Sequence, residues 1–296
     1  MTAILLFGAN GQLGQEILAR APAAALDVIG RSRSQTDIAN AAAVDAALRD
    51  VRPDLVVNAA AYTKVDKAET EREEAYRVNK DGAGILASAC AAADVPFVHI
   101  STDYVFDGAQ QKPYVEDDPV APVGVYGASK LAGEEEVRRR HKKHVILRTS
   151  WVYGQYGSNF LKTMLRLAEE RSELRVVADQ RGSPTCTADL AQAVFALAPR
   201  LTRADDRSWG TYHFTGEGET NWCQFADEIL TQRARWKGSR PRLTPITTAE
   251  YPTPARRPMN SVLDNRRFRS TFGLSAKSWK LSVKESVDAL IAPGRG

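Results

Sequence analysis

The segment AILLFGANGQLG at residues 3–14 decides the fold of this chain. Its first five residues form an uninterrupted apolar run, which indicates a buried parallel strand. Gly8, Gly11 and Gly14 follow in a G-x-x-G-x-x-G spacing, and residues 12–20 place their apolar side chains on one helical face. A strand, a glycine turn and a helix in this order are typical of a phosphate-binding loop at the start of a parallel sheet.

We predict that this loop holds the pyrophosphate of a dinucleotide. The first glycine allows the tight turn, the second lets the backbone approach the phosphates, and the third lets the helix pack close to the strand. The helix N-terminus also offers free N–H groups to phosphate. The residues expected in this part of the site are Gly8, Asn10, Gly11, Gln12, Leu13 and Gly14. The alternative is a glycine turn that binds no ligand.

The segment after the second predicted strand, residues 26–29, bears on the choice of cofactor. NAD sites usually have an acidic residue here, which binds the ribose 2′-OH. This chain instead has Arg31 and Arg33 among serines, and arginine suits a 2′-phosphate. We therefore predict NADPH, with NADH possible, because the arginines could also belong to a solvated loop. Asp37 and Ile38 stand where a loop that contacts adenine usually falls.

Strand and helix patterns alternate through the first half of the chain, which predicts an α/β Rossmann fold with a doubly wound parallel sheet. Further strands are expected at 54–58, 95–100 and 145–149, with a long helical stretch from about 66 to 92. Ligands bind outside the carboxyl ends of such strands. The cofactor is therefore expected to lie against the loop that contains Ala59, Ala60, Ala61 and Thr63.

The pattern loosens after residue 150, and we divide the chain there. Residues 1–150 form the predicted nucleotide-binding domain, which a helix at about 180–200 joins. Residues 151–296 form mostly a smaller C-terminal lobe that covers the substrate. Five prolines between 240 and 258 exclude a regular helix in that stretch.

Composition sets outer limits on the function. The chain has 296 residues, of which 43% are hydrophobic and 26% charged, as in ordinary globular proteins. It shows no secretory signal and no apolar run near the ~18 residues of a membrane span. Its three cysteines and four histidines show no disulfide or metal-site spacing. We expect a cytoplasmic protein without a metal and without a membrane or nucleic-acid partner, and the basic cluster 138–143 reads as a solvated helix end.

Tyr126 and Lys130 carry the predicted chemistry. Their spacing places both side chains on one face of a helix. An ammonium beside a phenol would lower the tyrosine pKa from roughly 10 toward working pH, which suits proton exchange with a carbonyl–alcohol pair. Thr102, just past the fourth predicted strand, is placed to meet the same ligand. The alternative is a partly buried structural tyrosine.

Together these motifs resemble the extended short-chain dehydrogenase/reductases, and within them the dTDP-4-dehydrorhamnose reductase family. The resemblance covers almost the whole chain. It rests on the blocks LLFGANGQLG (5–14), VNAAAYTKVDKAE (57–69), HISTDYVFDG (99–108), VYGASKLAGE (125–134), RTSWVY (148–153), GSPT (182–185) and RPMNS (257–261).

The resemblance implies that NAD(P)H reduces the C4 ketone of a dTDP-sugar, dTDP-4-dehydro-L-rhamnose. It implies that Tyr126 gives its proton to the oxygen at C4, that Lys130 holds the nicotinamide ribose, and that Thr102 hydrogen-bonds the same oxygen. It also implies that Thr102, Asp103 and Trp151 touch the sugar. Further expected neighbours of the substrate are Lys64, Val65, Tyr104, Phe106, Asn159 and Arg257. Trp151 and Phe106 could instead be core residues.

Some members of the family carry magnesium at a dimer interface, and this chain departs from that pattern. Glu16 matches one carboxylate position, but Ala188 stands where a glutamate aligns, with Asp189 one residue away. Magnesium requires several oxygen ligands in tight geometry. We therefore expect no metal-bridged dimer, while a homodimer of another kind stays possible.

Two other functions stay open at this point. Sugar-nucleotide dehydratases place a glutamate after the Thr-Asp pair, whereas Tyr104 follows Asp103 here. This argues against dehydration but not against epimerisation. A non-catalytic regulatory subunit of methionine adenosyltransferase also resembles this family, but such a subunit need not keep Thr102, Tyr126 and Lys130 together.

Overall fold

A six-stranded parallel sheet forms the larger part of the protein in a computed structural model that describes residues 2–203 and 205–292. Its strands are β1 (Ala3–Phe7), β2 (Asp27–Arg31), β3 (Leu55–Asn58), β4 (Phe97–Thr102), β5 (His144–Thr149) and β10 (Gly210–His213). They lie in the order β10-β5-β4-β3-β1-β2, and every neighbouring pair is parallel. The predicted doubly wound α/β fold is therefore confirmed.

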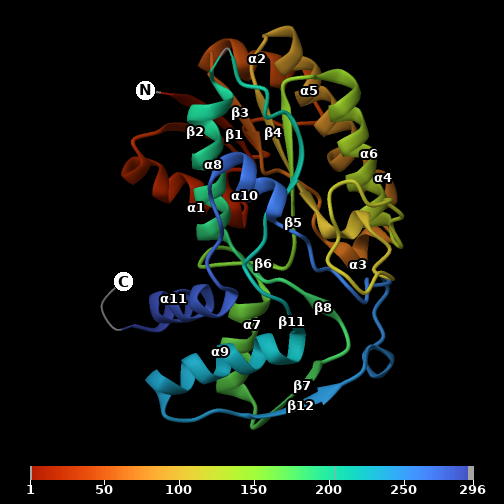
Figure 1. The fold of residues 1–296 in the computed structure, drawn as a ribbon, viewed down its shortest axis with the longest axis vertical. Helices are drawn as coiled ribbons and strands as arrows, with labels where there is room; N and C mark the ends of the chain where they lie inside the picture. Colours follow the sequence, from red (N-terminus) through yellow and green to blue (C-terminus); the bar gives the residue numbers. More distant parts are fainter. Residues whose placement is uncertain (1, 204, 293–296) are drawn as a thin grey trace.

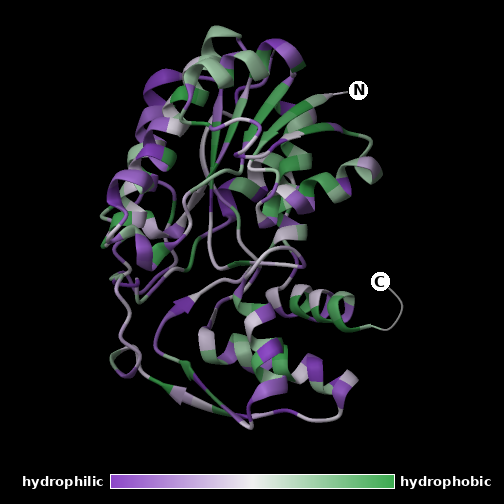
Figure 2. Cartoon of the chain, turned by 180° about the vertical axis from the view of Figure 1, so that it is seen from behind, coloured by the Kyte–Doolittle hydropathy of each residue, from purple (hydrophilic) through white to green (hydrophobic). Residues whose placement is uncertain are grey.

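Helices cover both faces of the sheet (Figure 1). One face packs against α1 (Gln12–Arg20), α8 (Thr187–Leu201) and α10 (Arg266–Phe272), and the other against α2 (Ala41–Val51), α5 (Ala83–Ala92) and α6 (Val125–Arg140). Strand β1 shows why its sequence is apolar throughout. Ile4 and Leu6 enter the first core, whereas Leu5 and Phe7 enter the second. Figure 2 shows the strands in hydrophobic green and many outward helix positions in purple.

The helical stretch predicted from about 66 to 92 is present but irregular. It comprises α3 (Val65–Ala68), α4 (Arg72–Tyr76), a π-helical turn η2 (Arg77–Gly82) and α5, and the last three follow one another without a break. Asn79 in this turn exchanges two hydrogen bonds with the Tyr62 backbone, at 2.8 and 3.1 Å. Its carbonyl oxygen also packs so closely on Gly133 of α6 that a Cβ there would lie 2.0 Å away. The tight contact with α6 therefore accompanies the irregular turn.

A smaller lobe lies at the carboxyl ends of the strands (Figure 1). Its helices are α7 (Phe160–Glu170), α9 (Trp222–Lys237) and α11 (Trp279–Ile291), which share a third core with the parallel pair β7 (Glu173–Val177) and β12 (Arg242–Ile246). The remaining short elements are η1 (Ala21–Ala24), η3 (Asp103–Val105), β6 (Val152–Tyr153), β8 (Arg181–Gly182), β9 (Thr185–Cys186), β11 (Thr220–Asn221) and η4 (Thr248–Glu250).

The chain returns to the main sheet after entering the lobe. Besides α8, which was expected near 180–200, strand β10 and helix α10 join the larger part. Strand β10 was not predicted, because its sequence GTYH lacks the apolar run of a buried strand. The division of the chain at residue 150 stays a proposal. Among the helices described here, none combines the length and apolarity that a bilayer crossing requires.

Candidate active site

The glycine loop packs against the backbone of the loop that follows β3. Gly8 has φ +87°, and a Cβ on it would lie 2.5 Å from the Ala60 nitrogen. A Cβ on Gly14 would lie 2.1 Å from the Gly8 oxygen. Only glycine therefore fits these two positions. The contact places the predicted phosphate loop and the loop at Ala59–Ala61 side by side at one edge of the sheet.

The start of helix α1 fits the phosphates of a dinucleotide. Its N-cap residue is Gly11, which has no side chain to cap the first helical N–H groups. Asn10 and Gly11 are exposed at this end. The Leu13 side chain lies in the core, so that residue can offer a ligand only its backbone. Gln12 instead accepts a hydrogen bond from Asn159 at 3.0 Å.

The two arginines predicted to bind a 2′-phosphate are engaged with carboxylates. Arg31 ends β2 and lies 2.9 Å from Asp50, and the exposed Arg33 lies 2.9 Å from Glu74. Exposed ion pairs contribute only about 0–1 kcal/mol, so a phosphate could displace these partners. Asp37 accepts from Arg77 at 3.0 Å, and Ile38 is buried.

Helix α6 carries Tyr126 and Lys130 at its beginning. Its N-cap, Gly124, has no side chain, and Glu69 accepts the Val125 N–H at 2.9 Å instead. This charge-assisted hydrogen bond fixes the backbone directly before Tyr126. Tyr126 is partly exposed, and its ring meets the Tyr104 ring edge-on with 5.4 Å between centroids.

Thr102 is the last residue of β4, which ends two residues later than predicted, and it lies beside the phenol. Its hydroxyl donates to Asp103 Oδ1 at 3.0 Å and accepts the Tyr104 N–H at 3.2 Å. Hydrogen bonding to Thr102 also favours ionisation of the Tyr126 phenol. The structure thus brings the predicted threonine and tyrosine together at the carboxyl edge of the sheet.

In this structure Lys130 does not lower the pKa of Tyr126, so that expectation is wrong. Burial raises the pKa of Tyr126 well above its ordinary value, the negative charge of Asp103 raises it further, and Thr102 only opposes this. Lys130 Nζ instead donates to the Ile100 carbonyl at 2.7 Å. Burial lowers the pKa of Lys130 to about 8, although Glu134 opposes the shift. Tyr126 is therefore a neutral phenol, which is the form that can donate a proton.

Asp103 is a buried carboxyl group with unused capacity. It is 2% exposed, and burial raises its pKa to about 6, while Ser261 and Thr102 oppose the shift. Its Oδ2 has no partner in hydrogen-bond geometry among the described residues. A buried charged oxygen without a partner is unfavourable, and this is the physical reason why burial raises the pKa of the carboxyl group.

A buried ion pair fixes α6 against the sheet. Glu134 accepts two hydrogen bonds from Arg148 on β5, at 2.9 and 2.7 Å, and one from Ser101 on β4 at 2.5 Å. Burial alone would raise the pKa of Glu134, but the charge and hydrogen bonds of Arg148, together with the charge of Arg138 and the Ser101 hydrogen bond, hold it at about 2. Glu134 stands one helical turn after Lys130 and so helps to place it.

Trp151 is held in an unusual conformation at the entrance to the lobe. Its φ is +48°, which is rare for a bulky residue. Its ring stacks on Trp222 with 3.7 Å between centroids, and a Cβ on Gly182 would lie 2.4 Å from the indole. Trp151 is partly exposed, so its fixed ring can present an apolar face to a ligand.

The other predicted substrate neighbours differ in their surroundings. Phe106 is 1% exposed and stacks on Tyr114 in the core, which was the alternative left open; the prediction that it touches the substrate is wrong. Arg257 is partly exposed and donates to the Tyr104 hydroxyl at 3.1 Å and to Asp66 at 3.0 Å. Asn159 caps α7 by accepting the Lys162 N–H, and its amide nitrogen donates to Gln12 and to the Gly154 carbonyl. The exposed residues Thr63 and Lys64 and the partly exposed Val65 lie just before and at the start of α3.

The two carboxylates considered for magnesium are bound by protein groups. Glu16 accepts from Arg20 and from Thr187, the latter at 2.8 Å, and Asp189 accepts from Ser282 at 2.5 Å. Within residues 2–203 and 205–292 no group of three or more possible ligands among His, Cys, Asp and Glu is suited to a metal ion. The absence of a magnesium-bridged dimer stays a prediction.

Three residues that support the site were not predicted. Glu69 and Glu134 lie within the blocks that carry the resemblance, and Asn79 lies outside them. The spacing of Glu134 from Lys130, one helical turn, could have identified it. Glu69 and Asn79 act on segments far away in the sequence, and no local pattern indicates such partners.

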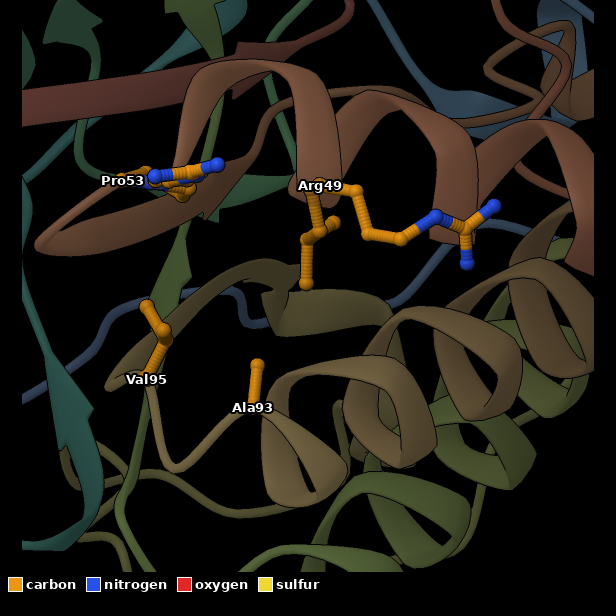
Figure 3. A pocket seen from close by; sticks show the side chains of 6 residues that line it. Arg49, Pro53, Ala93 and Val95 are labelled. Atoms are coloured by element: carbon orange, nitrogen blue, oxygen red, sulfur yellow. The ribbon is translucent and has the colours of Figure 1, made fainter.

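The hollow drawn in Figure 3 belongs to the opposite edge of the sheet. Its lining residues are Leu48, Arg49, Arg52, Pro53, Ala93 and Val95. Pro53 and Val95 precede β3 and β4, so the hollow lies at the amino ends of these strands. Tyr126 and Lys130 lie at the carboxyl ends, where ligands bind in such sheets.

Comparison with known proteins identifies the family of the chain. The chain matches the family described as RmlD substrate binding domain over residues 1–292. A dTDP-4-dehydrorhamnose reductase of Sinorhizobium fredii is 45% identical over 97% of both chains, and that of Escherichia coli K12 is 42% identical over 97% of both. A crystal structure of the Bacillus anthracis dTDP-4-dehydrorhamnose reductase in complex with NADP superposes with a TM-score of 0.90 at 38% identity, covering 96% of this chain and 98% of that one.

These matches cover nearly the whole length and exceed what a shared fold alone would give. The resemblance inferred from the sequence is confirmed. The chain belongs to the RmlD substrate binding domain family and is similar to these dTDP-4-dehydrorhamnose reductases over nearly its whole length.

Proposed function

We propose that this protein reduces the C4 ketone of dTDP-4-dehydro-L-rhamnose to an alcohol with NADPH. The observation that carries the proposal is the placement of Thr102 at the end of β4 and of Tyr126 at the start of α6, where both residues lie at the carboxyl edge of the sheet. The family match and the relatives named as reductases of this sugar supply the substrate. NADH is the alternative cofactor.

The glycine loop and the start of α1 would hold the pyrophosphate, and Arg31 with Arg33 would take a 2′-phosphate. Gly8 and Gly14 allow the turn and α1 to pack closely, and Gly11 leaves the first N–H groups of α1 without a side-chain cap, so they can bind phosphate. Ala59 to Ala61 would lie against the cofactor, and Asp37 with Ile38 would border its adenine. A reduced nicotinamide, when bound, supplies a hydride to the ketone carbon.

Tyr126 neutralises the charge that develops on the ketone oxygen. Its raised pKa keeps the phenol protonated, so it can transfer that proton to the oxygen at C4. Thr102 can hydrogen-bond the same oxygen when its hydroxyl turns away from Asp103. Lys130, one turn further along α6, holds the ribose and compensates the phenolate that remains.

The sugar and diphosphate would lie between this edge and the lobe. Asp103 is buried and would act on the sugar through Thr102, to which it is hydrogen-bonded, and the fixed ring of Trp151 can cover an apolar face of the sugar. Arg257 suits the diphosphate because its planar fork pairs two oxygens. Tyr104 would orient Arg257 through their hydrogen bond. We also propose a cytoplasmic location, in keeping with the free thiols of Cys90, Cys186 and Cys223.

One incubation separates this function from its alternatives. The protein is mixed with dTDP-4-dehydro-L-rhamnose and NADPH, and the absorbance of the reduced nicotinamide is followed. Stoichiometric loss of NADPH with formation of the alcohol supports the reductase. A change of the sugar without loss of NADPH indicates an epimerase, and binding without any reaction indicates a regulatory subunit.

A further inference from the structure

A buried chain of polar side chains runs beneath the site from the cofactor loop to Lys130. Asn58 and His99 are register neighbours on β3 and β4, and Asn58 Nδ2 lies 3.1 Å from His99 Nδ1. His99 Nε2 lies 3.5 Å from Lys130 Nζ. Asn58 and His99 are each 1% exposed, and Lys130 is 2% exposed. Neither Asn58 nor His99 belongs to the site predicted from the sequence.

The orientation of the Asn58 amide decides where His99 carries its proton. The backbone N–H of Ala60 donates to Asn58 Oδ1 at 3.0 Å, so the amide nitrogen faces His99 and donates to Nδ1. Burial and the positive charge of Lys130 keep His99 neutral by lowering its pKa. A neutral imidazole that accepts at Nδ1 carries its proton on Nε2, which faces Lys130.

Lys130 can accept the Nε2 proton of His99 in a hydrogen bond only as a neutral amine, because an ammonium has no lone pair. Two states of the pair are therefore possible. In one state Lys130 is a neutral amine that accepts from His99 Nε2 and still donates to the Ile100 carbonyl at 2.7 Å. In the other state Lys130 is an ammonium with one more proton, taken from bulk water. His99 then carries its single proton on Nδ1, and the Asn58 amide turns and releases the Ala60 N–H.

We propose that His99 is a positioning residue of the reduction, which holds Lys130 against the end of β4 and couples its protonation, through Asn58, to the cofactor loop at Ala60. The inference rests on the proposed function, in which Lys130 holds the ribose and compensates the Tyr126 phenolate. The ammonium state serves that role, and it frees a backbone N–H in the loop that would border the cofactor.

Few other charges surround the pair. Glu134 on α6 favours the charged form of both Lys130 and His99. Arg138 on α6 and His144 on β5 disfavour a charged His99. The pKa of Lys130, lowered by burial to about 8, therefore sets where the two states exchange.

The state of His99 can be measured without substrate. The chain has four histidines, so ¹⁵N NMR of the imidazoles gives few signals, and His99→Gln identifies those of His99. We expect His99 to change from the Nδ1–H to the Nε2–H tautomer as the pH rises through about 8. A tautomer that stays constant between about pH 6.5 and 9.5 would overturn the coupling.

Kinetics test whether this coupling serves the reaction. In His99→Gln the amide oxygen can accept a hydrogen bond from the Lys130 ammonium and stabilise it. The limb of the kcat/KM profile that reports the titration of Lys130 should therefore move to higher pH by roughly half a unit or more. In His99→Leu the added apolar surface disfavours the ammonium, so the same limb should move to lower pH. His144→Gln changes another buried histidine, at the far end of the sheet, and should leave the profile in place.

A purely structural role predicts a different result. It would lower kcat/KM by one factor at every pH and leave the position of the limb unchanged in both His99 variants, provided that their melting temperatures stay near that of the wild type. That result would reject the proposal. If the wild type fails to reduce the sugar, the proposed function fails, while the NMR titration still decides the coupling.

Discussion

Glu134→Gln should destabilise the protein by about 3 kcal/mol. Glu134 is fully buried and accepts two hydrogen bonds from Arg148 and one from Ser101. Burial alone would raise its pKa, but Arg148 holds that pKa at about 2, against an ordinary 4.5. At about 1.4 kcal/mol per pKa unit, a difference of about 2.5 units favours the folded state by about 3–4 kcal/mol.

Urea unfolding followed by circular dichroism at pH 7 measures this loss. Glutamine keeps the volume but removes the charge, which leaves Arg148 buried and uncompensated; breaking such a pair typically costs about 3–5 kcal/mol. Glu136→Gln is the matched control on the same helix. Glu136 pairs with Arg139 and Arg140, whose side chains are 64% and 36% exposed, so its loss should be below about 1 kcal/mol.

The pH dependence has a definite sign. Because the pKa of Glu134 is lower in the folded than in the unfolded protein, its stabilisation is fully present above about pH 4.5 and is lost as the pH falls toward about 2. The difference between wild type and Glu134→Gln should therefore shrink over that range. Equal stability of Glu134→Gln and Glu136→Gln at pH 7 would refute the reasoning.

Three further substitutions test other parts of the site. Arg31→Ala should raise KM for NADPH by roughly tenfold and leave that for NADH unchanged, because only a 2′-phosphate needs the guanidinium; an equal effect on both cofactors would reject this. Glu69→Ala should lower the free energy of unfolding by about 1 kcal/mol and also kcat, because it frees the N–H at the start of α6; a normal kcat would separate this cap from Tyr126. Trp222→Leu should raise KM for the dTDP-sugar but not the Kd of NADPH, since it removes the ring on which Trp151 stacks; unchanged KM would show that Trp151 needs no such support.

The parts of the fold that follow from local patterns could be predicted from the sequence. The apolar run before Gly8, and the glycine spacing after it, located β1, the turn and α1. Strand β10 was not predicted, because its burial comes from pairing with β5 and from contact with α10, and both are far away in the chain. The irregular turn η2 was not predicted, because Asn79 and Gly133 come into contact only in the folded protein.

The site shows the same limit. Tyr126 and Thr102 were predicted from their motifs, and they meet as expected. The pKa of Tyr126 was predicted in the wrong direction because spacing on a helix says nothing of where Lys130 Nζ is bound. The sequence also could not show that Phe106 enters the core, since an aromatic side chain just after a strand can face either the core or the ligand site.

The rate of hydride transfer in Tyr126→Phe tests the central claim most directly. In a single turnover with saturating NADPH and dTDP-4-dehydro-L-rhamnose, loss of the proton donor should slow the reaction by about 10²–10⁴-fold. The Kd of NADPH should stay near that of the wild type, because the glycine loop is untouched. A transfer rate within a few-fold of the wild type would contradict the account, since another group would then supply the proton.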